Sequence, residues 1–361
     1  MRKRDIAMDV LITGGTGFLG AHLCRRLVAE GHRVSVLHRA TSNLARIYDL
    51  PLRQVTGDIT DAAAVLAAAQ GQEVVIHAAA HLAYWRQMRQ AQAAINVDGT
   101  RHVVAACTAS GVRRLIHISS VAAIGIPEDG RAADETFAFN LQQSGLNYPI
   151  SKREAELAVL HAVDHGLDAV VVNPSSIFGP DGRGFRGAGL IEKVRRGRFV
   201  TYFPGGINAV HVDDVVDGIL AALAQGRSGQ RYILGGENLT YRRAAEIVLQ
   251  ELAAQGIQRR QRLVRVPAAL TWLAAQVMEP VGALRGVRPR FTYDVHYCAQ
   301  RFQYYDSGKA HRELGYRARP FAEIVRGYLG DAPPQPAEAE PSMKPVVTGP
   351  ATSHAQRSSQ P

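Results

Sequence analysis

The sequence predicts an α/β protein built on a doubly wound parallel sheet, followed by a smaller C-terminal part. Strand-like and helix-like segments alternate over the first two-thirds of the chain, which implies strand–helix–strand units with right-handed crossovers. The strand candidates are short, nearly continuous runs of apolar and β-branched residues, as expected for strands covered on both faces. The first of them leads directly into a glycine-rich run, TGGTGFLG.

The order of the elements follows from this alternation. The segments that we interpret as strands are Asp9–Thr13, Arg33–His38, Arg53–Gly57, Val74–Ala78, Leu115–Ser119, Ala169–Asn173 and Arg231–Leu234. The segments between them that we interpret as helices are His22–Glu30, Asp61–Gln70, Val97–Ser110, Ser151–His165 and Asp213–Ala224. We therefore expect residues 8–180 to form most of a first domain, to which residues 209–235 return. Residues 181–330 should form most of a second domain, and residues 331–361, rich in Pro, Ala, Ser and Gln, a disordered tail.

The composition is that of an ordinary globular chain, with 46% hydrophobic and 20% charged residues among 361. Its cysteines, Cys24, Cys107 and Cys298, are scattered without metal-ligand spacing, so we expect no metal site, no disulfide and a cytoplasmic location. No apolar run reaches the roughly 18 residues that span a bilayer. The net charge of +10 is spread over short arginine clusters rather than one stripe, which argues against a nucleic-acid partner.

The glycine-rich run predicts a dinucleotide site, because it directly follows an apolar strand and opens a helix. Gly14 would permit a tight turn, and Gly17 would let the backbone approach a pyrophosphate. Gly20 would let the helix pack closely against the loop. The helix N-terminus would then face the phosphate charge.

The end of the second strand distinguishes the two nicotinamide dinucleotides. An Asp or Glu about 20 residues past the loop would bind the ribose 2′-hydroxyl of NAD. This chain has VLHRATSN there, with Arg39 and no acid, and a cation suits the 2′-phosphate of NADP. We therefore favour NADP(H) as cofactor, with NAD(H) as the alternative. Asp58, after the third strand, is placed to touch the adenine, to serve as an ordinary helix N-cap, or to do both.

Tyr148 and Lys152, in the run YPISK, indicate the chemistry. Four residues apart on a helix, they share a face, so the ammonium can lie beside the phenol and favour phenolate. A tyrosine tuned in this way can give or take a proton while hydride moves to or from a nicotinamide. Tyr305 and Lys309 have the same spacing, but they span a predicted Asp-Ser-Gly turn, so we expect that pair to be structural.

Further runs add to these motifs: GDITD at 57–61, HAAA at 77–80, INVDGT at 95–100, ISSVAAIG at 118–125, NPSSIFGP at 173–180 and AVHVDDVV at 209–216. With them the chain resembles an extended short-chain dehydrogenase/reductase of the NAD-dependent epimerase/dehydratase superfamily, over roughly residues 8–330. It is most similar to the dihydroflavonol reductase and 3β-hydroxysteroid dehydrogenase branch. The resemblance implies a Rossmann-type fold.

The resemblance also implies roles for individual residues. Tyr148 would be the proton donor or acceptor, and Lys152 would lower its pKa and hold the nicotinamide ribose. Ser120, rather than its neighbour Ser119, matches the serine that hydrogen-bonds the substrate carbonyl oxygen, and Asn96 matches a position linked to a proton relay or a helix kink. The predicted cofactor-binding set is Gly14, Thr16, Gly17, Phe18, Leu19, Gly20, Arg39, Asp58, Ile59, Ala78, Ala79, Tyr148, Lys152, Pro174, Ser175 and Ile177.

The resemblance and the apolar stretch Val266–Leu284 favour reduction of a bulky lipophilic ketone, such as a steroid, flavonoid, polyketide or quinolone, or the reverse oxidation. His81 and Trp85 are candidates for the substrate pocket, with packing in the core as the alternative. The apolar stretch itself fits a helix of the substrate domain, or else a lid or a peripheral contact with a membrane. A homodimer is a further expectation. The alternative functions are a nucleotide-sugar epimerase or dehydratase that retains NAD, and a non-enzymatic regulator that senses the cofactor.

Overall fold

The computed structural model describes residues 7–330 except 182–184, 198, 258–260 and 290. The expected disordered tail, 331–361, lies outside these residues. The described residues form a seven-stranded sheet with the order β11-β6-β5-β4-β1-β2-β3, in which all neighbouring strands are parallel. Its strands are β1 (Asp9–Thr13), β2 (Arg33–His38), β3 (Arg53–Thr56), β4 (Val74–His77), β5 (Arg114–Ile118), β6 (Ala169–Pro174) and β11 (Arg231–Leu234). The predicted doubly wound sheet is confirmed, with strand ends within one residue of those expected.

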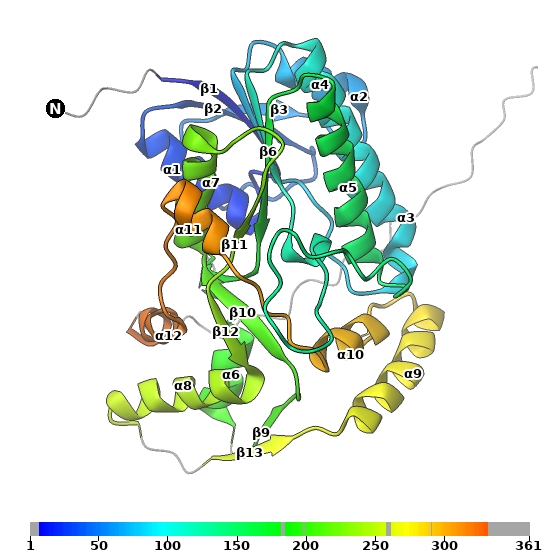
Figure 1. Cartoon of the computed structure of the whole chain (residues 1–361), viewed down its shortest axis with the longest axis vertical. Coiled ribbons are helices and arrows are strands. Elements are labelled where there is room, and N and C mark those ends of the chain that lie inside the picture. Colours follow the sequence, from blue (N-terminus) through cyan, green and yellow to red (C-terminus); the bar gives the residue numbers. More distant parts are fainter. Residues whose placement is uncertain (1–6, 182–184, 198, 258–260, 290, 331–361) are drawn as a thin grey trace, which may run out of the picture.

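Helices cover both faces of this sheet (Figure 1). On β1, Val10 and Ile12 contribute to one apolar core, whereas Leu11 contributes to the other, because successive side chains of a strand point to opposite faces. The first core is covered by α1 (Phe18–Ala29), α7 (Val212–Gln225) and α11 (Gly308–Leu314). The second is covered by α2 (Ala62–Ala69), α4 (Gly99–Ala109) and α5 (Asn147–Asp164).

Two helices begin earlier than the sequence predicts, and both differences affect the site. Helix α1 starts at Phe18, directly after Gly17, rather than at His22. Helix α5 starts at Asn147 rather than Ser151, because Pro149 is tolerated in the first turn, where its missing N–H costs no hydrogen bond. Tyr148 is therefore helical, one turn before Lys152.

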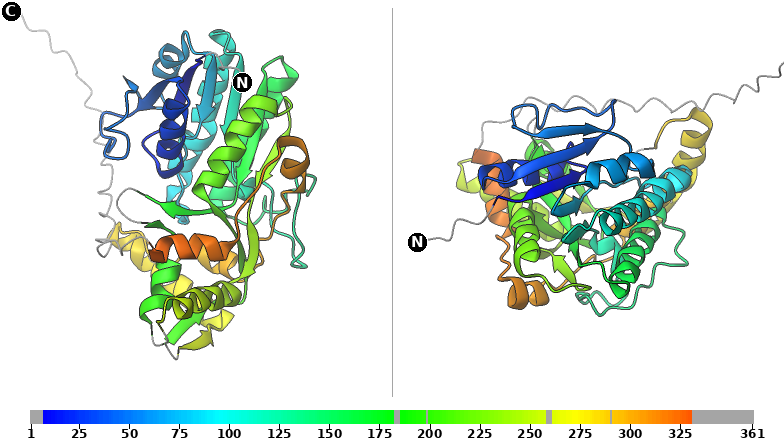
Figure 2. Two further views of the ribbon diagram at one scale, coloured as in Figure 1. Left: turned by 90° about the vertical axis from the view of Figure 1, so that its left-hand side faces the viewer. Right: turned by 90° about the horizontal axis from the view of Figure 1, so that it is seen from above.

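The chain after β6 alternates between this sheet and a smaller part (Figure 2). Within the described ranges, that part holds a four-stranded sheet, in the order β12-β10-β7-β8, and the strand pair β13-β9. Its strands are β7 (Ser176–Pro180), β8 (Phe185–Arg186), β9 (Phe199–Tyr202), β10 (Gly206–His211), β12 (Glu237–Thr240) and β13 (Arg262–Arg265). Its helices are α6 (Ala188–Arg196), α8 (Tyr241–Ala254), α9 (Ala268–Arg285), α10 (Tyr293–Ala299) and α12 (Phe321–Gly330).

A third apolar core lies beneath α6, α8 and α12, separate from the two cores of the large sheet. Between residues 209 and 235 the chain returns to the large sheet through α7 and β11. Among the described residues, no helix is long and apolar enough to cross a membrane.

Candidate active site

The glycine loop lies against the backbone that follows β4. Gly14 has a φ of +75°, and a Cβ there would lie 2.6 Å from the backbone N of Ala79. Gly14 therefore meets two demands that only glycine satisfies, a left-handed backbone and a close approach. A Cβ on Gly20 would collide with the Gly14 carbonyl. Gly17 is the N-cap of α1 and supplies no side-chain cap, so the first N–H groups of the helix remain available for an anion.

A cavity of about 230 Å³ opens between this loop and the carboxyl ends of β2, β3 and β4. It is lined by Thr13, Gly14, Thr16, Gly17, Leu37, His38, Arg39, Ser42, Gly57, Asp58, Ile59, Ala78, Ala79, Ala80, His81 and Ile95. A cavity in this place fits the adenosine and phosphate half of a dinucleotide. The cavity brings together Gly14, Thr16, Gly17, Arg39, Asp58, Ile59, Ala78 and Ala79 of the predicted cofactor set.

Other predicted cofactor residues do not line this cavity. Phe18, Leu19 and Gly20 form the first turn of α1 beside it, where Phe18 and Gly20 are buried. The sequence interpretation also omitted several residues that do line it, namely Thr13, Leu37, Ser42, Gly57, Ala80 and Ile95. Thr13, Leu37 and Gly57 are at or next to the carboxyl ends of their strands, which is the signal that could have revealed them.

The end of β2 presents a basic and hydroxylic surface to the cavity. Arg39, His38 and Ser42 all line it, and the Ser42 hydroxyl accepts a hydrogen bond from the backbone N–H of Arg39 at 3.1 Å. Asp58 lines the opposite wall, where its carboxylate accepts from the backbone and hydroxyl of Thr60 at 2.9 Å. The alternative that Asp58 is the N-cap of the following helix is wrong, because Asp61 caps α2 by accepting from Ala63 and Ala64.

Lys152 is buried beneath the carboxyl end of β5. Its Nζ donates to the carbonyl oxygen of Ile118 at 2.8 Å, and its side chain is almost fully enclosed. Burial lowers the pKa of Lys152 to about 8, and the carboxylate of Glu156 opposes that shift. An ammonium with so low a pKa loses its proton more readily than that of an ordinary lysine. This suits a group that exchanges hydrogen-bond partners during a reaction.

The two adjacent serines at the end of β5 have different partners. Ser119 is buried and donates to Glu156 Oε2 at 2.8 Å. Ser120 is partly exposed, and its hydroxyl oxygen accepts from the backbone N–H of Ala122 at 3.2 Å as the N-cap of a short 3-10 turn. That bond uses a lone pair of Ser120, so its hydroxyl proton can be donated to a substrate oxygen. The geometry therefore favours Ser120 over Ser119 as the substrate-facing serine.

Asn96 connects the cofactor cavity to the helix that carries the tyrosine. It lies in a π-helical turn, Ala93–Asp98, that precedes α4. Its Oδ1 accepts from the backbone N–H of His81 at 2.7 Å, and its Nδ2 donates to Ser151 Oγ at 3.0 Å. The Ser151 hydroxyl in turn donates to the carbonyl of Tyr148 at 3.0 Å. An unbroken chain of hydrogen bonds thus runs from the cavity wall to Tyr148.

Glu156 is fully buried one turn after Lys152 and connects several elements. Its Oε2 accepts from Ser119 and from Asn173 Nδ2, the latter at 2.9 Å. Its Oε1 lies 3.2 Å from Arg153 Nη1 and 2.6 Å from Arg231 Nε. Asn173 Nδ2 also donates to the carbonyl of Ser120 at 3.0 Å. The sequence interpretation missed Glu156, although its position four residues after Lys152 placed it on the same helical face.

The remaining predicted residues lie around this centre. Pro174 ends β6, Ser175 follows it, and Ile177 lies in β7 and packs on the first core. His81 lines the cofactor cavity, so it lies nearer the cofactor side than its expected place in the substrate pocket. Trp85 is 95% buried, and its carbonyl lies 3.5 Å from Asn147 Nδ2, which agrees with the core alternative.

Tyr305 and Lys309 have separate partners. The Tyr305 hydroxyl donates to the Gly125 carbonyl at 3.0 Å. Lys309 donates to Gln230 Oε1 at 2.8 Å and lies over the Tyr232 ring. The prediction that this second pair is structural agrees with these contacts.

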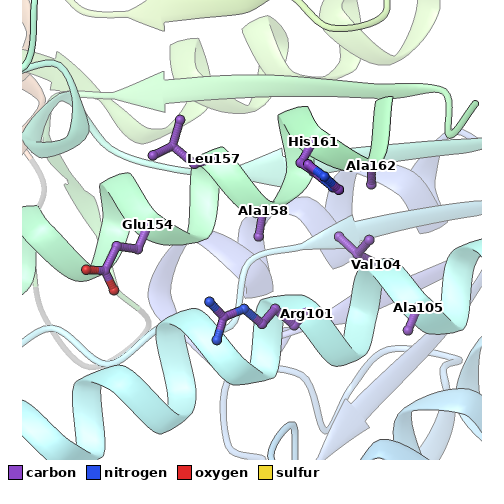
Figure 3. Close-up of a pocket in the computed structure, with 8 residues that line it drawn as sticks. All are labelled: Arg101, Val104, Ala105, Glu154, Leu157, Ala158, His161 and Ala162. Carbon is purple, nitrogen blue, oxygen red and sulfur yellow. The ribbon is translucent and has the colours of Figure 1, made fainter. Parts of the chain in front are cut away.

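A larger cavity, about 530 Å³, lies between α4 and α5. Figure 3 shows that its walls come from these two helices. Its lining residues are Arg101, Val104, Ala105, Glu154, Leu157, Ala158, His161 and Ala162. None of the predicted site residues lines it, so its size does not make it the active site. Among the described residues, no group of three or more His, Cys, Asp or Glu side chains could hold a metal ion.

Comparisons with known proteins agree with this geometry. A family model described as the NAD dependent epimerase/dehydratase family matches residues 10–235. A putative dihydroflavonol 4-reductase of Synechocystis sp. is 35% identical over 312 residues, which cover 84% of this chain and 88% of that protein. Sterol demethylase protein B of Methylococcus capsulatus is 33% identical over 311 residues, which cover 85% of this chain and 93% of that protein.

Among solved structures, dTDP-glucose 4,6-dehydratase of Streptomyces venezuelae, with NAD and TYD bound, superimposes with a TM-score of 0.66 at 26% identity. The match covers 90% of this chain and 98% of that chain. The chain therefore belongs to the NAD dependent epimerase/dehydratase family, within the extended short-chain dehydrogenases/reductases, and is an NAD(P)-dependent enzyme of the oxidoreductase type.

Proposed function

We propose that this protein is an NADP(H)-dependent reductase that converts a bulky lipophilic ketone into a secondary alcohol, or catalyses the reverse oxidation. The observation that carries the proposal is the hydrogen-bonded chain from the glycine-loop cavity through Asn96 and Ser151 to Tyr148. This chain ends on the backbone carbonyl of Tyr148 and fixes the first turn of α5 relative to the cofactor cavity, which supports a proton-transferring role for the Tyr148 phenol. The substrate would bind where Tyr148 and Ser120 can both reach its oxygen.

The chemistry follows from the properties of these side chains. When bound, the cofactor supplies or accepts the hydride at its nicotinamide ring. Tyr148 delivers a proton to the substrate oxygen, and Ser120 donates a hydrogen bond that fixes this oxygen. The Lys152 ammonium favours the phenolate form of Tyr148 and moves from the Ile118 carbonyl to the cofactor ribose.

The preference for NADP(H) rests on the end of β2. Arg39 lines the cavity, and no carboxylate stands at that strand end to bind a ribose 2′-hydroxyl. A guanidinium forms strong, often bidentate, hydrogen bonds with a phosphate. A 2′-phosphate would therefore be attracted to this wall, whereas NAD would leave Arg39 without a charged partner.

A lipophilic substrate is supported by the aromatic groups on the far side of Tyr148. The Tyr84 ring packs edge-on against Tyr148, with centroids 5.9 Å apart. Burial raises the pKa of Tyr84 well above its ordinary value, and Cys298 and Tyr148 add to this effect. Tyr84 therefore stays neutral at ordinary pH, so this side of the site presents an uncharged aromatic group. The relatives named for dihydroflavonol and sterol chemistry are consistent with such a substrate.

The test is NADPH oxidation by the purified enzyme across a panel of lipophilic ketones and of UDP- and dTDP-sugars. We expect stoichiometric NADPH consumption with a ketone and exchange of the cofactor in every turnover. Tyr148→Phe should abolish turnover while cofactor binding remains nearly unchanged. Tyr316→Phe is the matched control, because that phenol bonds the Gly235 carbonyl in a structural position.

A second pair of variants separates the serines. Ser120→Ala should lower kcat strongly, whereas Ser119→Ala should lower stability and leave most of the turnover. Tightly retained NAD, together with conversion of a nucleotide sugar without net redox change, would instead establish the epimerase or dehydratase alternative. Binding of the cofactor without turnover of any tested substrate would favour the regulator.

A further inference from the structure

Helix α9 presents apolar side chains to solvent. Leu270, Leu273, Val277, Val281 and Leu284 are 59%, 54%, 56%, 40% and 89% exposed. Their spacings of three and four residues place them along one side of the helix, and we call these five residues the α9 apolar face. A contiguous exposed patch of this kind marks an interaction site more often than a random surface.

The opposite side of α9 is the more polar one. Thr271 is buried there, and its hydroxyl lies 2.8 Å from His296 Nδ1 and accepts from Gln300 Nε2 at 3.1 Å. Glu279 also points inward, with its Oε2 near the backbone N–H of Tyr293. The helix is thus fixed to α10 through polar contacts, while its apolar face is directed outward. An ordinary surface helix has the reverse arrangement.

Arginines flank the α9 apolar face at both ends. Arg262 and Arg265 precede the helix, and Arg285 and Arg288 follow its last apolar turn; all four are exposed. Between residues 262 and 289 the sequence contains a single acidic residue, the inward-pointing Glu279. This surface is therefore an apolar strip between two cationic ends, and it complements a surface that is both apolar and anionic.

Two observations place α9 beside the site. Figures 1 and 2 show the helix at the periphery of the smaller part of the molecule, with one side open. At its C-terminal end, the positive charge of Arg288 acts on His81 of the cofactor cavity. On the neighbouring α10, Tyr293 packs under the guanidinium of Arg86, which belongs to the loop after β4. The C-terminal end of α9 therefore lies toward the edge of the active-site region.

We propose that the α9 apolar face binds the surface of an anionic phospholipid membrane, with the helix lying in the plane of the interface. At 18 residues the helix is about 27 Å long, and none of the described helices can cross a bilayer. Lying flat, it would bury its leucines and valines among the acyl chains and place its arginines at the phosphates. In this position the C-terminal end of α9 would bring the edge of the active-site region toward the bilayer, from which a lipophilic substrate could enter; that last step rests on the proposed function.

A second copy of the chain fits this face less well. The arginines lie at both ends of the strip, so a two-fold contact would bring arginines together whether the two helices ran parallel or antiparallel. The whole chain also carries a net charge of +10, which opposes self-association through a cationic surface. Anionic lipid headgroups remove this repulsion.

The experiment is flotation of the full-length protein with vesicles of phosphatidylcholine alone or with 25% phosphatidylglycerol. We expect binding to the anionic vesicles, weakened at high salt. The double variant Leu273→Ser/Val277→Ser should bind at least tenfold more weakly, on the order expected for two buried side chains. Both positions are exposed, so folding should be retained, which circular dichroism verifies.

Leu157→Ser is the matched control, because Leu157 is 48% exposed on α5, away from α9. It should float like the unmodified protein. Arg285→Glu/Arg288→Glu should lose the preference for anionic vesicles. The proposal is overturned if the unmodified protein binds neither kind of vesicle, or if the double variant binds as strongly as the unmodified protein. It is also overturned if sedimentation shows that the α9 substitutions dissociate a dimer. None of these measurements requires turnover, so failure here is distinguishable from failure of the proposed reaction.

Discussion

Neutralising Glu156 should weaken the fold and alter the titration of the site at the same time. In Glu156→Gln the side chain keeps its shape but loses its charge and one of its two acceptor oxygens. Among the described residues, Ser119, Asn173 and Arg153 donate hydrogen bonds to this carboxylate. The Arg231 guanidinium forms an ion pair with it. A glutamine cannot accept from all of them, because its amide NH2 would meet donors.

The magnitude follows from burial. The carboxylate is fully enclosed, and the Arg231 side chain is only 14% exposed, so the substitution leaves a largely buried guanidinium without its anion. Removing one partner of such a pair costs roughly 3–5 kcal/mol, and the remaining amide oxygen recovers part of it. We expect a loss of about 3 kcal/mol in the free energy of unfolding, measured by urea titration. Glu154→Gln, two residues earlier and exposed, should stay within about 0.5 kcal/mol.

The same variant should shift the pH profile. Glu156 opposes the fall of the Lys152 pKa, which burial has brought to about 8. Without that carboxylate the ammonium loses its proton at lower pH, so the alkaline limb of kcat/KM should move downward from its wild-type position. An unchanged urea midpoint combined with an unchanged alkaline limb would refute the role that we assign to Glu156. If Glu156→Gln lowers the free energy of unfolding but leaves the alkaline limb of kcat/KM unchanged, Glu156 contributes to stability alone.

Three further predictions follow from single side chains. Arg39→Ala should lower the ratio of kcat/KM for NADPH to kcat/KM for NADH by about ten- to a hundredfold. The control Arg53→Ala, at the amino end of β3, should leave this ratio unchanged. Because Lys152 titrates near 8 in the fold and at 10.5 in the unfolded chain, the unfolded state binds more protons between these values. The free energy of unfolding should therefore rise by about 3 kcal/mol from pH 8 to 10.5 in urea titrations, and Lys152→Met should lack this rise. Burial lowers the pKa of His77 to about 3 in the folded protein, against 6.5 in the unfolded chain. The free energy of unfolding should therefore fall by about 5 kcal/mol as the pH falls from 6.5 to 3. In acid titrations, His77→Gln should lose less stability over this range.

The parts of the fold that sequence reasoning predicts best are those fixed by local pattern. Strands such as β1 and β6 are short apolar runs, and their burial on both faces leaves little choice of structure. The glycine loop is similarly determined, since a left-handed Gly14 pressed against Ala79 tolerates no other residue. The sequence predicts that α5 starts at Ser151, whereas it starts at Asn147, because Pro149 is compatible with the first turn of a helix.

The parts that sequence reasoning misses depend on contacts between distant segments. Arg231 is an unremarkable charge in the sequence, at the start of the last strand of the sheet. It becomes significant only because β11 lies beside β6, which brings it to Glu156 on α5. Similarly, the apolar stretch that contains α9 is ambiguous in the sequence. Its outward orientation is decided by the polar contacts of Thr271 with His296 and Gln300, which are 25 and 29 residues away in the sequence.

The distinction between the adjacent serines shows how such contacts select a reactive group. Successive side chains at a strand end point in different directions, so only one of the two adjacent serines reaches Glu156. Since Glu156 takes the Ser119 hydroxyl, the Ser120 hydroxyl, which accepts from the Ala122 N–H, keeps its proton for another acceptor. Lys152 and Glu156 lie one turn apart on the same helix and both bind the end of β5. Lys152 bonds the backbone carbonyl of Ile118, and Glu156 accepts from the Ser119 side chain. A buried carboxylate that touches no substrate can in this way determine which hydroxyl takes part in the reaction.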